Sequence, residues 1–166
     1  MENQEIVPGT HFKYKNIEWS CLNKDGNIYF LMAAEPVAIR TFSGSSYKNT
    51  TNDWKDSDLR KWLNEDFINI FDDGDLVPIK QSLRADNGDW CYGECEDYVS
   101  LLTCDQYRDY REFIPDPKDY FWLLTPSSCD YPNYFHVKVS LAGELSTCAT
   151  INKCMVLPVI KLIIED

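Results

Sequence analysis

Strand-like alternation at both ends of the chain, with one helical stripe between them, predicts a mixed α+β fold. Residues 17–22 alternate between apolar and polar side chains, and residues 28–33 supply a returning strand. Asp25-Gly26 between them predicts a tight hairpin turn, because both residues tolerate positive φ. Residues 36–42 continue as an extended segment, and a polar loop begins at residue 43.

An apolar stripe in the middle of the chain has helical spacing. Its members are Leu59, Trp62, Leu63, Phe67 and Phe71. The stripe predicts a core-facing helix over residues 57–71, with Asp56 and Ser57 at its start and Gly74 as its stop.

A second, shorter helix is predicted from residue 103 to about residue 111, because Thr103 and Gln106 have the spacing of a capping box. Short strands are predicted over residues 76–79 and 97–102, with a polar loop over residues 85–96 between them.

The last third of the chain again predicts strands. They cover residues 120–124, 134–141, 144–150 and 155–164. On residues 134–141 the alternation assigns one face to Phe135, Val137, Val139 and Leu141. The closing strand is apolar enough to lie centrally in a sheet, with Pro158 at a position without a ladder hydrogen bond.

The charge of the chain restricts its partners. A length of 166 residues fits one domain over residues 1–166, and the net charge is −11 with a pI of about 4.5. A chain with this much negative charge repels nucleic-acid phosphates and anionic membranes. We therefore expect a protein partner, and we expect the chain to bind neither nucleic acid directly nor membranes. Because Met1 is followed by a polar, acidic stretch, we expect a cytoplasmic protein without a secretory signal.

The seven cysteines are expected to be reduced and mostly buried in that compartment. Cys91 and Cys95 lack the usual zinc-knuckle spacing, so neither a metal site nor a cofactor is expected. No carboxylate pair, glycine-rich phosphate loop or local Cys–His signature marks a catalytic site, and the histidines are His11 and His136 alone. We therefore expect a protein that is not an enzyme.

One block of the sequence reads Asn-x-Trp-x-x-Ser-x-Leu-Arg-x-Trp-Leu-Asn, formed by Asn52, Trp54, Ser57, Leu59, Arg60, Trp62, Leu63 and Asn64. This block resembles that of a bacterial and phage family, the 6273 domain-of-unknown-function family. Weaker blocks follow in the family's order at residues 99–103, 122–126, 137–143 and 156–162. We expect the first block, above all Asn52, Trp54, Ser57, Arg60, Trp62 and Asn64, to be structural, with Arg60 paired to a nearby acid.

The later blocks are similar to those of C-type-lectin-like domains. That resemblance implies two helices around a twisted antiparallel sheet, termini close together, and a binding face in the last third of the chain. Leucines at 124 and 157 replace two arginines of the pattern, which suggests a coupled apolar replacement. No calcium-binding cluster typical of sugar-binding lectins is present.

Two polar loops hold the candidate partner-binding residues, because Tyr, Trp, Asn and Ser make adaptable contacts in binding loops. They are Trp90 and Tyr92 in one loop, and Ser128, Asp130, Tyr131, Asn133 and Tyr134 in the other.

The leading hypothesis is a non-enzymatic module that binds a protein through its C-terminal sheet and loops. One alternative is a phage-encoded acidic inhibitor of a host defence nuclease, an anti-CRISPR-like nucleic-acid mimic acting on a basic nucleic-acid-handling enzyme. A glycan or small-ligand binder is another, and an enzyme with a Cys–His or metal centre is the third.

Overall fold

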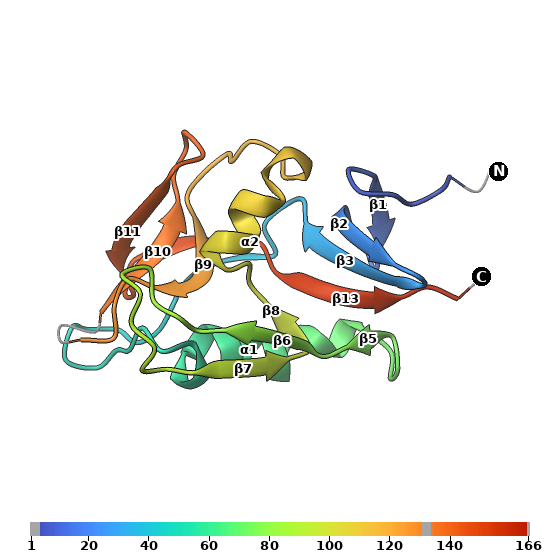
Figure 1. Ribbon diagram of the computed structural model, residues 1–166. Helices are drawn as coiled ribbons and strands as arrows, with labels where there is room; N and C mark the ends of the chain where they lie inside the picture. The colour runs from blue at the N-terminus through green and yellow to red at the C-terminus, as the bar shows by residue number, and fades with distance from the viewer. Residues whose placement is uncertain (1–3, 131–133, 166) are drawn as a thin grey trace.

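A computed structural model of the protein describes residues 4–130 and 134–165. In the described part of the chain, strands form two large sheets and one separate hairpin, with two short α-helices packed between and beside them (Figure 1). The mixed α+β class predicted from the sequence is therefore confirmed. The single twisted sheet is a wrong prediction, because the strands divide between separate sheets.

The first sheet contains the N-terminal hairpin and has the order β1-β2-β3-β13-β5, with β8 also paired to β13. Its strands are β1 His11–Tyr14, β2 Ile17–Asp25, β3 Ile28–Ala33, β5 Leu76–Val77, β8 Val99–Ser100 and β13 Val159–Ile163. The predicted turn joins β2 to β3, and Gly26 has a φ of 60° there. The predicted hairpin turn is therefore confirmed, but it is shifted by one residue: Asp25 pairs with Ile28 as the last residue of β2, and Gly26 and Asn27 form the turn.

The second sheet has the order β11-β10-β9-β12-β4. Its strands are β4 Ala38–Thr41, β9 Phe121–Pro126, β10 Phe135–Val139, β11 Leu145–Ala149 and β12 Lys153–Val156. A separate hairpin pairs β6, Ile79–Ser82, with β7, Glu94–Asp97, so the predicted loop over residues 85–96 ends earlier than expected.

The predicted closing strand over residues 155–164 is two strands that belong to different sheets. β12 lies between β9 and β4, and β13 lies between β3 and β5, so both are central as expected. The chain crosses between the sheets at Leu157 and Pro158. Proline lacks a backbone N–H, and the Pro158 carbonyl accepts a hydrogen bond from Ala33 N at 2.9 Å. The proline therefore marks the crossing point.

The predicted long helix is shorter than expected. α1 covers Asp58–Glu65 and gives way at Asp66 to a 3-10 turn, η2, over Phe67–Ile70. The tighter turn still buries Phe67, and it brings Phe71 against Tyr14 and Trp19, with ring centroids 6.2 Å apart in both pairs. Tertiary contacts thus override the helical periodicity after residue 65.

The other helical segments are short. α2 covers Cys104–Asp109 and begins with the predicted capping box of Thr103 and Gln106. Single 3-10 turns form η1, Trp54–Asp56, and η3, Arg111–Phe113.

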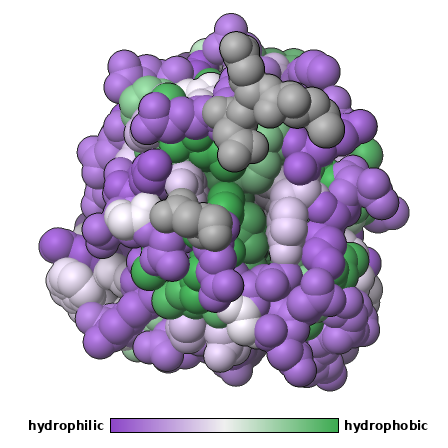
Figure 2. Space-filling view, turned by 90° about the vertical axis from the view of Figure 1, so that its right-hand side faces the viewer, coloured by the Kyte–Doolittle hydropathy of each residue, from purple (hydrophilic) through white to green (hydrophobic). Residues whose placement is uncertain are grey.

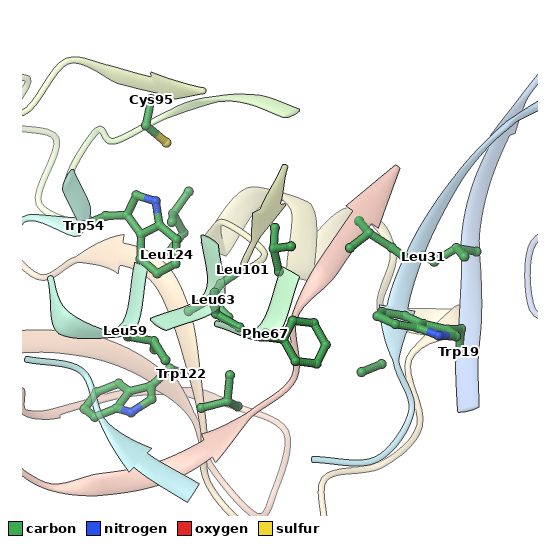
Figure 3. Packing of buried hydrophobic residues seen from close by; sticks show 14 of the residues in the cluster. Trp19, Leu31, Trp54, Leu59, Leu63, Phe67, Cys95, Leu101, Trp122 and Leu124 are labelled. Atoms are coloured by element: carbon green, nitrogen blue, oxygen red, sulfur yellow. The ribbon is translucent and has the colours of Figure 1, made fainter. Parts of the chain in front are cut away.

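The main core cluster joins the two sheets through α1 and η2. Figure 3 shows Trp54 and Trp122 at one end of this cluster and Trp19 at the other, with Phe67 between them. The three tryptophans are at most 1% exposed. The aromatic richness of the sequence is therefore used to fill the space between the sheets.

A second cluster covers the opposite face of β9 and β12, with Phe121, Leu123 and Met155 among its members. Leu124 belongs to the first cluster and Leu157 to the second. The expected coupled replacement at these two positions is therefore wrong, because Leu124, in β9, and Leu157, after the end of β12, lie in different clusters.

Two of the four residues that the alternation assigned to one face of residues 134–141 are exposed. Phe135 is 42% and Leu141 54% exposed, whereas Val137 and Val139 are fully buried. β10 is paired on both sides, but its first residue and the turn after it extend beyond the cover of the core. The alternation of residues 134–141 therefore predicted which side chains share a face, but not how far along the chain that face is buried.

The two ends of the chain lie on the same side of the molecule (Figure 1). On this side a band of hydrophobic residues crosses a hollow between hydrophilic flanks (Figure 2). A hollow of about 670 Å³ here is lined by residues that include Ile6, Phe12, Ile163 and Ile164. The last two are half-buried, so the end of β13 is less enclosed than its middle.

Candidate functional site

Three loops meet at the end of the molecule opposite the termini (Figure 1). They are residues 43–53, residues 84–93, and residues 127–130 with Tyr134 and Phe135, and we call them together the loop end. The sequence placed candidate residues in the second and third loops separately. The structure joins the two candidate patches and adds the first loop to them.

A buried asparagine holds the three loops together. Asn52 is fully buried, and its Nδ2 donates to the carbonyl oxygens of Ser128 at 2.7 Å and Phe135 at 2.9 Å. Its Oδ1 accepts a hydrogen bond from the Tyr92 hydroxyl at 2.6 Å. Burial, followed by the charges of Asp53 and Asp56, raises the pKa of Tyr92, so this hydroxyl stays a donor.

A disulfide between Cys91 and Cys129 links the second and third loops. Backbone hydrogen bonds reinforce the link, from Asp86 N to Pro126 O at 2.9 Å and from Asn87 N to Ser127 O at 3.2 Å. The expectation that all seven cysteines are reduced is therefore wrong. The two cysteines lie 38 residues apart in the chain, and only the fold brings them together.

The first loop depends on a glycine. Gly44 has a φ of +72°, and a Cβ atom built on it would lie 1.9 Å from the Asn49 carbonyl oxygen. Its backbone N donates to Asp58 Oδ2 at 2.8 Å, which ties the loop to the first turn of α1. No side chain fits at residue 44 without moving the loop.

Aromatic side chains are exposed on all three loops. Tyr47 is 60% and Trp90 58% exposed, in addition to Phe135. Tyr134 packs edge-on against Tyr47 with centroids 4.8 Å apart, and it contacts the Phe135 ring at the same distance. The Arg84 guanidinium lies 4.7 Å from the centre of the Trp90 ring. These rings are held in place rather than free on a mobile loop.

The predicted binding residues therefore have different roles. Trp90 and Asp130 are exposed and Tyr134 is half-buried, so these side chains are available for contact. Tyr92 and Ser128 are half-buried and help to hold Asn52. Tyr131 and Asn133 lie outside the described residues.

Sequence reasoning missed Tyr47, Arg84 and Phe135 at this end. An aromatic residue within the polar stretch of residues 43–47 was the available signal for Tyr47. Phe135 fitted a strand alternation, so its exposure carried no signal in the sequence.

The specific sequence block forms the scaffold beneath the loop end. Trp54 Nε1 and Arg60 Nε both donate to the buried Asp97 carboxylate, each at 2.8 Å. Asp97 is thus the acid expected beside Arg60. The Ser57 hydroxyl accepts from Arg60 N at 3.1 Å and caps α1.

The remaining block residues tie α1 to its neighbours. Asn64 exchanges two hydrogen bonds with the backbone of Val99, at 2.9 and 3.1 Å. The Trp62 ring is half-buried, lies 4.6 Å from the Arg40 guanidinium and packs on Phe67. Every polar member of the block makes a hydrogen bond within the fold, as a structural motif requires.

A polar groove of about 570 Å³ runs beside Trp90, between the second loop and α2. Charged and amide side chains line it, among them Arg84, Asp86, Asn87 and Arg108. Opposite charges are mixed, so the groove suits a polar, uncharged ligand better than a strongly charged one.

The described residues contain one group of side chains with the spacing of metal ligands. The atoms of Asp89, Cys91 and Cys129 lie within 4.8 Å of one another. Both sulfur atoms are joined in the disulfide, however, and a disulfide does not supply the thiolate ligands that a zinc site requires.

His136 and the buried thiols of Cys95 and Cys104 are poorly placed for nucleophilic chemistry. His136 is fully buried, its Nε2 donates to the Leu123 carbonyl at 2.6 Å, and burial lowers its pKa to about 3. Burial raises the pKa of Cys95 to about 12 and of Cys104 to about 11. A hydrogen bond with Cys154 lowers the pKa of the half-buried Cys148, but the histidine opposite it on β10 is the buried His136.

Part of this scaffold matches a known family of protein domains. Residues 27–83 match the model of a family described as a domain of unknown function (DUF6273). The match covers about a third of the chain and includes the whole of the block at residues 52–64. No curated protein and no solved structure matches the chain. In the described residues, no helix has the length and apolar character needed to cross a membrane.

Proposed function

We propose that the protein is a non-enzymatic binding module whose loop end contacts a protein partner. The observation that carries this proposal is the set of exposed rings of Tyr47, Trp90 and Phe135 on three loops that are tied to one another. Fixed aromatic side chains offer large contact areas at a low entropy cost, which is why binding surfaces are rich in them.

The chemistry of the site supports binding over catalysis. The exposed groups of the loop end are aromatic and polar, whereas the buried Asn52 amide is fully engaged in holding the loops. The His136 ring is enclosed, so it is out of reach of a substrate for general acid–base work. A reproducible turnover that a point substitution abolishes would contradict the proposal.

Affinity capture with matched variants tests the proposal. The wild type and a Tyr47→Ser/Trp90→Ser variant are each used to retain proteins from a nuclease-treated lysate of the producing cells. A Tyr98→Ser/Ile70→Ser variant is the control, because both residues are exposed and lie outside the loop end. We expect a partner that the wild type and the control retain and that the loop-end variant loses at least tenfold.

A partner retained equally by all three proteins would refute a role for the loop end. Repeating the capture at low and moderate salt separates two kinds of partner. A basic nucleic-acid enzyme that elutes as salt rises would favour the acidic inhibitor of a host defence nuclease, for which the net charge of −11 is the support.

Glycan binding is the second candidate function, favoured by the groove beside Trp90. An exposed tryptophan beside polar side chains offers an apolar platform together with hydrogen-bond partners for hydroxyl groups. A glycan array probed with the wild type and with Trp90→Ser would show ligands lost on substitution if this function is correct. An array without a reproducible ligand would exclude it for the glycans displayed.

Kinship with C-type-lectin-like domains is also a proposal, supported by the order of the later sequence blocks and by the two chain ends on one side of the molecule (Figure 1). The cytoplasmic location stays a prediction. The Cys91–Cys129 disulfide supports the opposite proposal, an oxidising compartment, because disulfides are rare in the reducing cytosol. Non-reducing mass spectrometry of the protein isolated from its own cells distinguishes the two.

A further inference from the structure

A cleft of about 520 Å³ lies where the two sheets meet and shares no residue with the loop end. Its floor contains Met32 from β3, Phe121 from β9, Met155 from β12, and Leu157 after β12. Residues 114–118 form one wall. The volume and the apolar floor are those of a small-molecule site.

One end of this junction cleft is acidic. Glu18 and Glu35 both line it, and their backbones are neighbours, because Ala34 N donates to the Glu18 carbonyl at 2.8 Å. The nearest basic group to the Glu18 carboxylate among the described ion pairs is His11, whose Nδ1 is 4.0 Å away. Glu35 has no ion-pair partner among the described residues.

The opposite wall balances this charge only in part. Asp116 is neutralised by Arg111, with Nη2 and Oδ1 2.9 Å apart. Lys118 is then the one lysine or arginine among the residues described as lining the cleft. Among the lining residues, Glu18 and Glu35 thus outnumber Lys118, and the lining favours a cation, although Lys13 on β1 lies opposite Glu18 in the strand register.

We propose that the junction cleft binds a small amine with an apolar chain. The chain would lie on the floor, where the flexible side chains of Met32 and Met155 adapt to its shape. The ammonium group would lie between Glu18 and Glu35, and its positive charge would be attracted to both carboxylates. This site is independent of the partner surface proposed for the loop end.

Three probes with the same six-carbon chain test the proposal: hexylamine, 1-hexanol and hexanoate. Each is titrated into protein with ¹³C-labelled methionine methyl groups, and the shifts of Met32 and Met155 report binding at the floor. We expect hexylamine to bind roughly three- to tenfold more tightly than hexanol, because two partly exposed carboxylates add a modest attraction. Hexanoate should bind most weakly.

A Glu18→Gln/Glu35→Gln variant isolates the role of the carboxylates. We expect its affinity for hexylamine to fall to that for hexanol, while the affinity for hexanol stays unchanged. Glu112→Gln/Glu144→Gln is the matched control, because it removes the same two charges from exposed positions outside the cleft. The control variant should keep the wild-type preference for the amine.

A Leu157→Arg variant should reverse the order, since a guanidinium group at the floor repels the amine and attracts hexanoate. Folding of this variant is checked by circular dichroism. If Leu157→Arg does not fold, the comparison of Glu18→Gln/Glu35→Gln with the wild type tests the proposal by itself. Equal binding of the three probes, the absence of methionine methyl shifts, or an unchanged amine preference in Glu18→Gln/Glu35→Gln would each overturn the proposal.

Discussion

Asp97 connects the sequence block at residues 52–64 to strand β7. Its buried carboxylate accepts from Trp54 Nε1 and Arg60 Nε, so the helix α1, the turn η1 and strand β7 meet at one group. A buried acceptor with two donors costs more to remove than an ordinary hydrogen bond, because both donors are left unsatisfied.

We expect Asp97→Asn to lower the free energy of unfolding by roughly 2–4 kcal/mol, since an amide supplies only one acceptor oxygen to the two donors. Urea unfolding followed by tryptophan fluorescence measures the change. Glu96→Gln, on the exposed side of the same strand, is the control and should stay within about 0.5 kcal/mol of the wild type. Equal stability of the two variants would show that this pair does not hold the scaffold.

His136 makes stability depend on pH. Its ring is stacked on Phe42 with centroids 3.7 Å apart, and burial lowers its pKa from 6.5 to about 3. The unfolded chain therefore binds one more proton than the folded chain between these two pH values. The contribution of His136 to the free energy of unfolding is fully present above pH 6.5, and it is lost as the pH falls from 6.5 to about 3.

The free energy of unfolding should fall by up to about 1.4 kcal/mol per pH unit through this group between pH 6 and pH 4. In His136→Gln, which keeps a donor for Leu123, we expect lower stability and a flatter pH profile. His11→Gln changes an exposed histidine and is the control for the loss of an imidazole. Parallel profiles for wild type and His136→Gln would disprove the assignment.

The start of α2 shows how a local signal and a tertiary contact cooperate. Gln106 N donates to Thr103 Oγ1 at 3.1 Å, and Thr103 N donates to Gln106 Oε1 at 3.0 Å, as the sequence predicted. Gln106 Oε1 also accepts from Gln81 Nε2 at 2.6 Å, a contact with β6 that the sequence did not reveal.

Thr103→Ala should cost about 1 kcal/mol of stability, because the first-turn N–H of Gln106 loses its side-chain acceptor. Thermal unfolding compares it with Thr103→Ser, which keeps the hydroxyl and should stay close to the wild type. A loss of the same size in the serine variant would assign the effect to the lost methyl group instead.

Elements with a local cause were predicted well, and those with a distant cause were not. The hairpin at Gly26 and the cap at Thr103 depend on residues within a few positions of one another. The helix expected to reach residue 71 ends at residue 65, because contacts of Phe71 with Tyr14 and Trp19 favour a tighter turn there. Those partners are more than fifty residues away in the chain.

At the scale of the whole molecule, the Cys91–Cys129 disulfide joins two loops of the loop end. The two residues are 38 positions apart, so we expect Cys91→Ser/Cys129→Ser to lose roughly 2–4 kcal/mol. Hydrogen exchange should accelerate more at residues 86–93 and 127–130 than in β2 and β3, because the loops lose their local link in addition to the global stability. Cys148→Ser removes a free thiol and is the control. Unchanged exchange in the double variant would show that Asn52 alone fixes the loops.

The sequence by itself determined the mixed fold class, the hairpin of β2 and β3, and the start of each helix. These depend on periodicity and on short-range hydrogen bonds, which one stretch of chain contains in full. Only the tertiary structure decided the division into two sheets at Pro158, the exposure of Phe135, the disulfide, and the meeting of three loops around Asn52. Alternation shows which residues share a face of a strand, but what covers that face is set by chain segments far away in the sequence.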